Sequence, residues 1–162
     1  QWRAMKIISG GQTGVDRAAL DAAIEMGVHY AGWCPKGGWA EDLPRAPGLL
    51  TLYHGLRETP LVSPRQRTKW NIRDADRLMV LADKAGVKVS QGTEAARDLA
   101  NRLDKPHIVL DLDASDALER ALAWLHRRDQ LGQAMGHAPD AFGFPEPAAL
   151  AIGLALAFAA PE

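Results

Sequence analysis

Residues 9–17 read Ser-Gly-Gly-Gln-Thr-Gly-Val-Asp-Arg and come at the end of a short apolar run, residues 6–9, that is typical of a buried strand. The next residues, from about 16 to 26, carry alanines on one face and are followed by Gly27, which predicts a helix packed closely on a sheet. Three glycines allow a tight turn and bring backbone N–H groups close to a ligand, and the helix N-terminus adds partial positive charge. The stretch therefore predicts an anion site, most simply for phosphate, at the end of the first strand.

This loop matches neither of the common phosphate-binding fingerprints. It lacks the Gly-Lys-Ser/Thr ending of the P-loop and the Gly-x-Gly-x-x-Gly spacing of dinucleotide-binding folds. Asp16 is either the helix N-cap or a ligand contact. Arg17 favours ligand contact, because a cation in the first helical turn opposes the helix dipole and gains little unless an anion is near. The alternative for the whole loop is a turn that serves only helix–sheet packing.

Further apolar runs alternate with helical stretches along the chain. Beyond the first strand and helix, strands are predicted at residues 28–32, 78–81 and 107–110, and helices at about 92–103 and 114–126. This alternation predicts a three-layer, Rossmann-like α/β fold with a central, mostly parallel sheet. In such a fold the ligand site lies at the carboxyl ends of the strands.

The remaining segments complete the predicted organisation as one domain, residues 5–162, with residues 1–4 as an extension. Residues 33–69 hold five prolines and show no sustained periodicity, so we expect a long functional loop there. Residues 148–160 are apolar on every helical face and shorter than the roughly 18 residues that span a membrane. We expect a helix that packs on protein, most simply on a second copy of the chain in a homo-oligomer.

Composition narrows the classes of partner. A hydrophobic content of 47% and a net charge of −1 are those of an ordinary globular protein, and they give no overall attraction to nucleic acid or to an anionic membrane. Cys34 is the single cysteine and no signal sequence opens the chain, which predicts a cytoplasmic protein without an intramolecular disulfide. The five histidines show no zinc-ligand spacing, and no nucleophile motif occurs, so we predict neither a metal ligand nor a catalytic residue.

Other loops supply further candidate ligand contacts. A second glycine-bearing helix start follows a later strand, and a local basic segment at residues 57–77 would attract an anionic ligand. Trp33 and Trp39 would either stack on a planar ring or pack in the core. The predicted binding residues are Ser9, Gly10, Gly11, Gln12, Thr13, Gly14, Asp16, Arg17, Lys36, Asn71, Arg73, Asp74, Ser90, Gly92 and Thr93.

Together these loops resemble the molybdenum carrier (molybdenum cofactor carrier) family. The resemblance rests on residues 9–21, the Gly-Trp-Cys-Pro-Lys-Gly of residues 32–37, Ala-Glu-Asp at 40–42, and Trp-Asn-Ile-Arg-Asp-Ala-Asp at 70–76. It covers about residues 5–112. It implies a Rossmann-like, often oligomeric protein that holds molybdenum cofactor, a pterin with a terminal phosphate, or molybdate or a nucleotide, for delivery to a molybdoenzyme.

The same resemblance leaves an enzymatic alternative open. Related phosphoribohydrolases cleave the N-glycosidic bond of nucleoside 5′-monophosphates and place a glutamate three residues after the threonine of their second glycine loop. Here that position is Ala96, while Glu94 directly follows Thr93 and lies about 200° away around the helix. Gln91 and Gly38 stand where the carrier family commonly has glycine and arginine, and its late Asn-Val-Ala-Gly-Pro-Arg segment has no clear counterpart.

Overall fold

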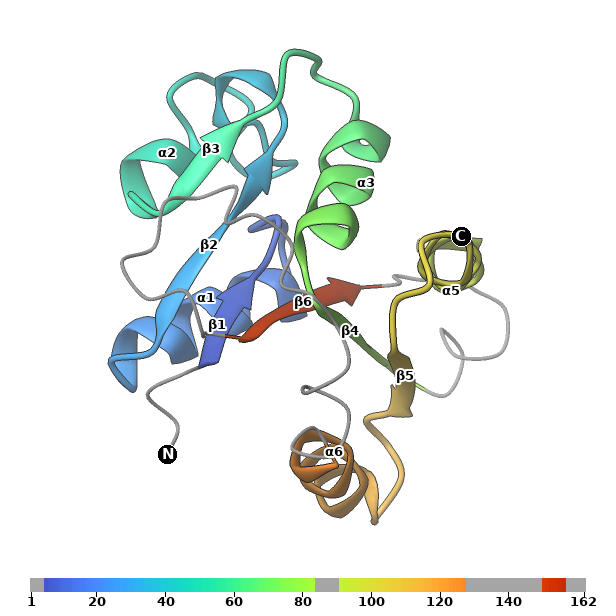
Figure 1. The fold of residues 1–162 in the computed structure, drawn as a ribbon. Helices are drawn as coiled ribbons and strands as arrows, with labels where there is room; N and C mark the ends of the chain where they lie inside the picture. Colours follow the sequence, from blue (N-terminus) through green and yellow to red (C-terminus); the bar gives the residue numbers. More distant parts are fainter. Residues whose placement is uncertain (1–4, 84–90, 128–149, 157–162) are drawn as a thin grey trace.

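The computed structural model describes residues 5–83, 91–127 and 150–156 (Figure 1). In these residues one parallel sheet has the strand order β3-β2-β1-β6-β4-β5. The strands are β1 (Met5–Ile8), β2 (His29–Cys34), β3 (Leu56–Glu58), β4 (Arg77–Ala82), β5 (His107–Asp111) and β6 (Leu150–Leu156). The predicted α/β fold with a parallel sheet is confirmed, as are the four predicted strands to within two residues at each end.

Helices cover both faces of this sheet, as the alternation of strand side chains shows. Trp33 of β2 faces α3, while the next residue, Cys34, packs with Leu20 of α1 on the other face. On β4, Leu78 and Val80 face α3 and α5, while Met79 packs toward α6. The helices are α1 (Val15–Glu25), the 3-10 turn η2 (Lys36–Gly38), α2 (Leu49–Leu52), α3 (Pro64–Asp74), α5 (Gln91–Arg102) and α6 (Ala117–His126). The three layers are therefore α1 with α6, the sheet, and α3 with α5.

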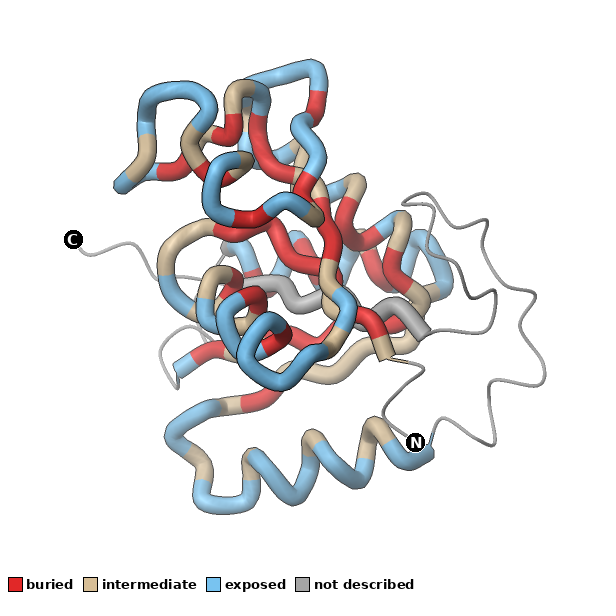
Figure 2. The backbone as a smooth tube through the Cα atoms, turned by 90° about the vertical axis from the view of Figure 1, so that its left-hand side faces the viewer, coloured by how far each residue is buried: buried red, intermediate tan, exposed pale blue. Residues whose placement is uncertain are grey.

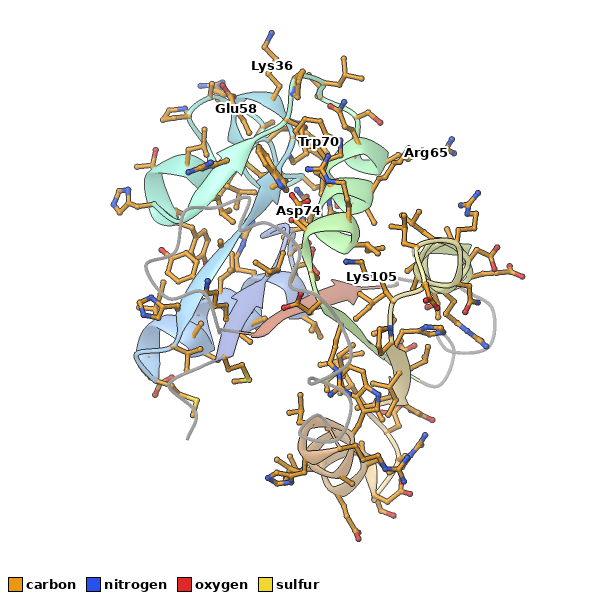
Figure 3. All side chains as sticks on the ribbon, viewed as in Figure 1. Lys36, Glu58, Arg65, Trp70, Asp74 and Lys105 are labelled. Carbon is orange, nitrogen blue, oxygen red and sulfur yellow. The ribbon has the colours of Figure 1, made fainter. Side chains whose placement is uncertain are left out.

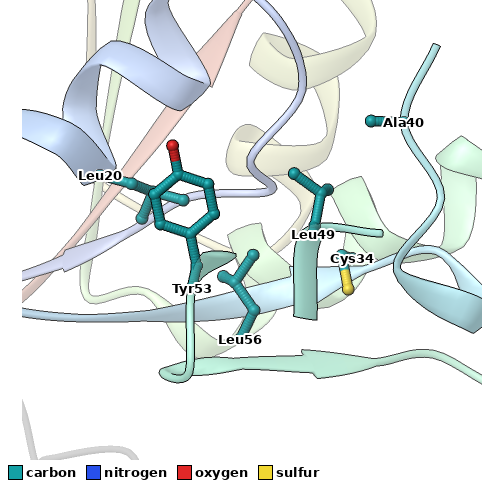
Figure 4. Packing of buried hydrophobic residues seen from close by; sticks show 6 residues of the cluster. All are labelled: Leu20, Cys34, Ala40, Leu49, Tyr53 and Leu56. Carbon is teal, nitrogen blue, oxygen red and sulfur yellow. The ribbon is translucent and has the colours of Figure 1, made fainter. Parts of the chain in front are cut away.

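Figure 2 shows how buried residues are distributed along the described backbone, and in α1 they follow the amphipathic pattern of the helix. In α1 the buried residues are Asp16, Leu20 and Ala23, one stripe at helical spacing. Gly27, at φ 66°, lies just beyond the end of this helix in a conformation that glycine adopts without strain. Beneath α1, a cluster of Leu20, Cys34, Ala40, Leu49, Tyr53 and Leu56 fills the space between α1, α2 and the β2–β3 edge (Figure 4).

The expectation for the apolar segment at residues 148–160 is wrong. Residues 150–156 form β6, and its backbone pairs with β1 on one side and β4 on the other. Strands at the centre of a parallel sheet are buried on both faces and read as near-continuous apolar runs. We inferred from the lack of a polar side that this segment is a helix at a subunit contact. The segment instead lacks a polar side because β6 lies at the centre of the sheet.

Residues 33–69 are more structured than predicted. They contain η2, α2, the short edge strand β3 and the first half of α3. Pro64 occupies the first turn of α3, where its missing N–H costs no helical hydrogen bond, so this proline begins a helix.

The position of β6 defines where the direction of the sheet reverses. From β1 the chain steps outward to β2 and β3, and from β4 it steps in the opposite direction to β5. β6 fills the place between β1 and β4. In open α/β sheets ligands bind beyond the carboxyl ends of the strands at this switch point. The carboxyl ends of β1 and β4 flank it.

Candidate anion-binding site

The glycine loop, residues 9–14, connects the carboxyl end of β1 to α1. Gly11 and Gly14 have φ of 72° and 91°, a region that other residues enter only with strain, and Gly14 is the N-cap of α1. The first backbone N–H groups of a helix have no partner within it. The loop therefore presents amide donors and the positive end of a helix at the switch point, as the sequence predicts.

Gly10 is required for a different reason, which is the closeness of Arg67. A Cβ at Gly10 would lie 2.2 Å from Nη1 of Arg67, so the guanidinium of this α3 residue rests directly on the glycine loop. The same Nη1 donates to Oδ2 of Asp16 at 2.9 Å. Asp16 is only 1% exposed and Arg67 16%, so this ion pair is buried where α1 and α3 meet the loop.

Asp16 is therefore not the N-cap of the helix, and that alternative is wrong. The side chain belongs to the buried stripe of α1 and turns inward toward Arg67. The backbone carbonyl of Asp16 accepts a hydrogen bond from the buried Ser9 hydroxyl at 2.7 Å. Ser9 thus closes the loop onto the first turn of the helix.

The anionic group that Arg17 contacts is a side chain of the protein itself, the carboxylate of Asp42. Its guanidinium makes a two-pronged contact with the Asp42 carboxylate, with Nη2 2.9 Å from Oδ1, and Nε donates to the Gly11 carbonyl at 3.2 Å. The hydrogen bond to Asp42 raises the pKa of Arg17, and the same contact lowers the pKa of Asp42. Gln12 Nε2 also donates to the Trp39 carbonyl at 3.0 Å. These contacts hold residues 39–42 against the glycine loop.

The predicted residues of α3 lie where this helix meets β2. Asn71 accepts from the Trp33 N–H at 2.7 Å and donates to the Trp33 carbonyl at 2.9 Å, which clamps the helix to the strand. Asp74 accepts from the Trp33 indole N–H at 2.7 Å and from Arg73 at 2.6 Å. Arg73 also lies 4.8 Å from the Trp70 ring centroid. Asn71, Arg73 and Asp74 are thus engaged with the protein's own groups.

The remaining predicted residues divide by position. Gly92 is exposed and Thr93 buried in the first turn of α5, which lies two strand positions from the glycine loop because β1 and β4 both pair with β6. Thr13 is half-buried within the loop. Lys36 is exposed and projects outward from the far end of β2 (Figure 3). Ser90 lies outside the described residues.

Two residues of this site were not predicted from the sequence. Arg67 belongs to the basic segment, but with α3 unrecognised nothing distinguished it from its neighbours. The available signal was the four-residue spacing from Arg67 to Asn71, which places both on one helical face. Asp42 was part of a quoted motif, but its contact with Arg17 spans 25 positions of the chain.

The described residues contain no group of three or more His, Cys, Asp or Glu side chains able to hold a metal ion. Cys34 is buried, and burial raises the pKa of its thiol to about 11. A thiol with this pKa is almost wholly protonated near neutral pH and is a poor nucleophile. Within the same residues, no helix is long and apolar enough to cross a membrane.

Comparison with known proteins places the chain in a family. The model of the circularly permutated YpsA SLOG family matches residues 7–133. A crystal structure from Syntrophus aciditrophicus SB, of a protein named "Putative molybdenum carrier protein", superimposes with a TM-score of 0.71 at 30% sequence identity. That match covers 95% of this chain and 83% of the other. No curated protein matches the chain. With its glycine loop at the switch point of a parallel sheet, the chain belongs to the circularly permutated YpsA SLOG family.

Proposed function

We propose that this protein binds and carries a small oxyanionic ligand, namely molybdenum cofactor, molybdate or a related phosphorylated, nucleotide-like molecule. The observation that carries the proposal is the glycine loop, whose positive-φ Gly11 and Gly14 open α1 beside the switch strand β6. Backbone amides and a helix N-terminus in this position bind anions. The name of the Syntrophus relative supports molybdenum as part of the cargo.

The residues around the loop fit an oxyanion. The guanidinium of Arg67 rests on the loop at Gly10, and that of Arg17 contacts the Gly11 carbonyl. The charge of the buried Asp16 carboxylate, which would repel an anion, is offset by Arg67 at 2.9 Å. Gly92 and Thr93 at the start of α5 supply a second edge of the same site.

The carrier role is favoured over nucleotide hydrolysis by the first turns of α5. Ala96 is 3% exposed and packs in the cluster with Ile72, Leu78, Val80 and Ala100, where the related hydrolases would have their glutamate. Glu94 is exposed. No carboxylate therefore occupies the position at which those enzymes act on the ribose.

The test is calorimetric titration of the purified protein with molybdate, tungstate and AMP, together with metal analysis and native mass spectrometry of protein purified without oxygen. We expect saturable binding of at least one of these anions. A matched pair of variants locates the site: Gly14→Ala and Gly27→Ala both force alanine into a positive-φ conformation, but only Gly14 lies in the loop. Binding should weaken in the first variant and persist in the second.

Two results would overturn the proposal. The carrier role fails if none of the three anions binds, or if both glycine variants bind like the parent. Release of free adenine from AMP would instead identify the phosphoribohydrolase reaction. The molybdoenzyme acceptor, the homo-oligomer and the cytoplasmic location stay predictions. Light scattering tests the oligomer.

A further inference from the structure

We infer that Arg67 is the side chain that binds the ligand oxyanion, and that Asp16 holds it in place. The inference rests on the proposed function and names the chemistry of that site. The ligand group it fits is a tetrahedral oxyanion, whether free molybdate or the terminal phosphate of a larger molecule. Arg17 and Arg73, the arginines that the sequence favours, are occupied by Asp42 and Asp74.

The first step of the argument is that Arg67 has donors to spare. A guanidinium carries five N–H donors in a rigid fork. In the described part of the chain, the hydrogen bond of this side chain is the single contact from Nη1 to Asp16. Its Nε is buried and has no hydrogen-bond partner there. Oδ1 of Asp16 is likewise buried and without a partner, so the ion pair uses one donor and one acceptor, and the remaining donors of the fork can serve a ligand oxyanion.

The second step is the place where these donors lie. Nη1 is the atom nearest to a Cβ built at Gly10, so the guanidinium packs directly on the glycine loop at a residue without a side chain. An oxyanion bound to the loop amides would meet the guanidinium there. Arginine matches phosphate-like oxyanions through two parallel hydrogen bonds, which lysine cannot offer.

The third step is the role of Asp16. Its carboxylate is almost wholly buried and contacts Arg67 through one oxygen, which fixes the long side chain while leaving the rest of the fork unused. A fixed guanidinium loses little conformational freedom when the ligand arrives. Asp16 is therefore a positioning residue, and its negative charge is tolerable near an anion only while Arg67 is present.

The experiment compares Asp16→Asn with the double variant Asp16→Asn/Arg67→Gln. Both lack the ion pair, but Asp16→Asn keeps the Arg67 charge and the double variant removes it, so their difference reports the contact of Arg67 with the ligand. Calorimetry with molybdate and with AMP should show Asp16→Asn binding more weakly than the parent, because Arg67 is no longer held in place, and the double variant about 10- to 100-fold more weakly than Asp16→Asn. If the double variant binds both molybdate and AMP more weakly, Arg67 recognises the oxyanion that the two probes share. If only AMP binds more weakly, Arg67 recognises a phosphate ester. Arg65→Gln removes an exposed charge from the same helix and should change the affinity less than about 2-fold.

A second measurement needs no variant and covers the case in which the double variant does not fold. The Nε–H signal of Arg67 in an ¹⁵N NMR spectrum should shift when molybdate or AMP saturates the parent protein. Equal affinities of the two Asp16 variants, or an Arg67 signal unmoved at saturation, would overturn the inference while the carrier function stands. Failure of the parent to bind either probe would overturn both.

Discussion

Gly32 of β2 lies so close to β1 that a side chain has no room. A Cβ there would stand 1.9 Å from the Ser9 carbonyl oxygen, which is backbone and cannot turn aside. We expect Gly32→Ala to lower the free energy of unfolding by about 3 kcal/mol or more. Gly27→Ala should cost about 1 kcal/mol, because its positive φ is strained but nothing lies within 4 Å of its Cβ. Urea unfolding of the two variants checks this, and equal losses would contradict the close approach.

The Arg17–Asp42 pair gives a pH dependence with a definite sign. The hydrogen bond from Arg17 lowers the pKa of Asp42 in the folded protein below its unfolded value of about 4. The pair therefore contributes stability above about pH 4, and this contribution is lost as the pH falls through the lowered pKa. We expect Asp42→Asn to destabilise the protein at pH 7, with the difference from the parent shrinking as the pH falls below about 4.

Urea midpoints measured across this pH range test the expectation. Glu41→Gln is the matched control, since it removes an adjacent exposed carboxylate, and it should follow the parent at every pH. A loss for Asp42→Asn that stays constant down to pH 2 would show that the pair does not stabilise the fold.

At the residue scale the sequence predicted the glycine loop but not the partners of its charged side chains. The physical argument for Arg17, that a first-turn cation needs an anion nearby, is sound. Here the anion is Asp42, brought close by the folding of residues 39–42 against the loop. Sequence spacing cannot reveal a contact made across 25 positions of the chain, and the same holds for Asp16 and Arg67.

Among the elements, those with clear periodicity were predictable and those without it were not. β4 and α1 carry strong apolar patterns and were found within two residues of their ends. β3 has only three residues, and α3 is so polar, with buried residues limited to Asn71 and Ile72, that its pattern is faint. The apolar run of β6 fits a buried helix and a buried strand equally well. We predicted a helix, and the structure shows a strand.

Tyr53 ties α2 to α1 through its hydroxyl, which donates to Asp21 at 2.6 Å. Burial first, and then this hydrogen bond, raise the pKa of Tyr53 to about 12. We expect Tyr53→Phe to cost about 1 kcal/mol at pH 7. The unfolded chain loses the phenolic proton near pH 10, so the contribution is complete below pH 10 and is lost as the pH rises toward 12.

Ultraviolet titration and urea unfolding between pH 8 and pH 12 measure both effects. Tyr30→Phe serves as the control, because the described residues show an edge contact with Tyr53 but no hydrogen bond for the Tyr30 hydroxyl. Ionisation of Tyr53 near pH 10 would exclude the interaction with Asp21.

For the whole molecule, β6 joins two half-sheets, β3-β2-β1 and β4-β5. Ala155 pairs with Val80 of β4 in this ladder. We expect Ala155→Pro to cost about 3 kcal/mol or more, because proline cannot donate to the ladder that β6 forms with β4 and fits poorly inside a strand. Ala155→Gly keeps the N–H and should cost about 1 kcal/mol or less.

Circular dichroism with urea unfolding distinguishes the two Ala155 variants. Deleting residues 148–162 should likewise abolish the fold, rather than release soluble monomers as a helical subunit contact would predict. A folded, soluble deletion variant, or an Ala155→Pro protein as stable as Ala155→Gly, would contradict the central position of β6.

The placement of β6 also sets the order in which the protein becomes complete during its synthesis on the ribosome. The neighbour that β1 and β4 share is translated after both of them. Between the end of β5 at Asp111 and the start of β6 at Leu150 lie 38 residues. At usual translation rates this interval lasts about 2 to 8 s. During that time two unpaired inner edges are exposed in the nascent chain, and such edges are sites of misassociation. Native folding must therefore finish late, and newly made chains should depend on protection by chaperones until β6 emerges.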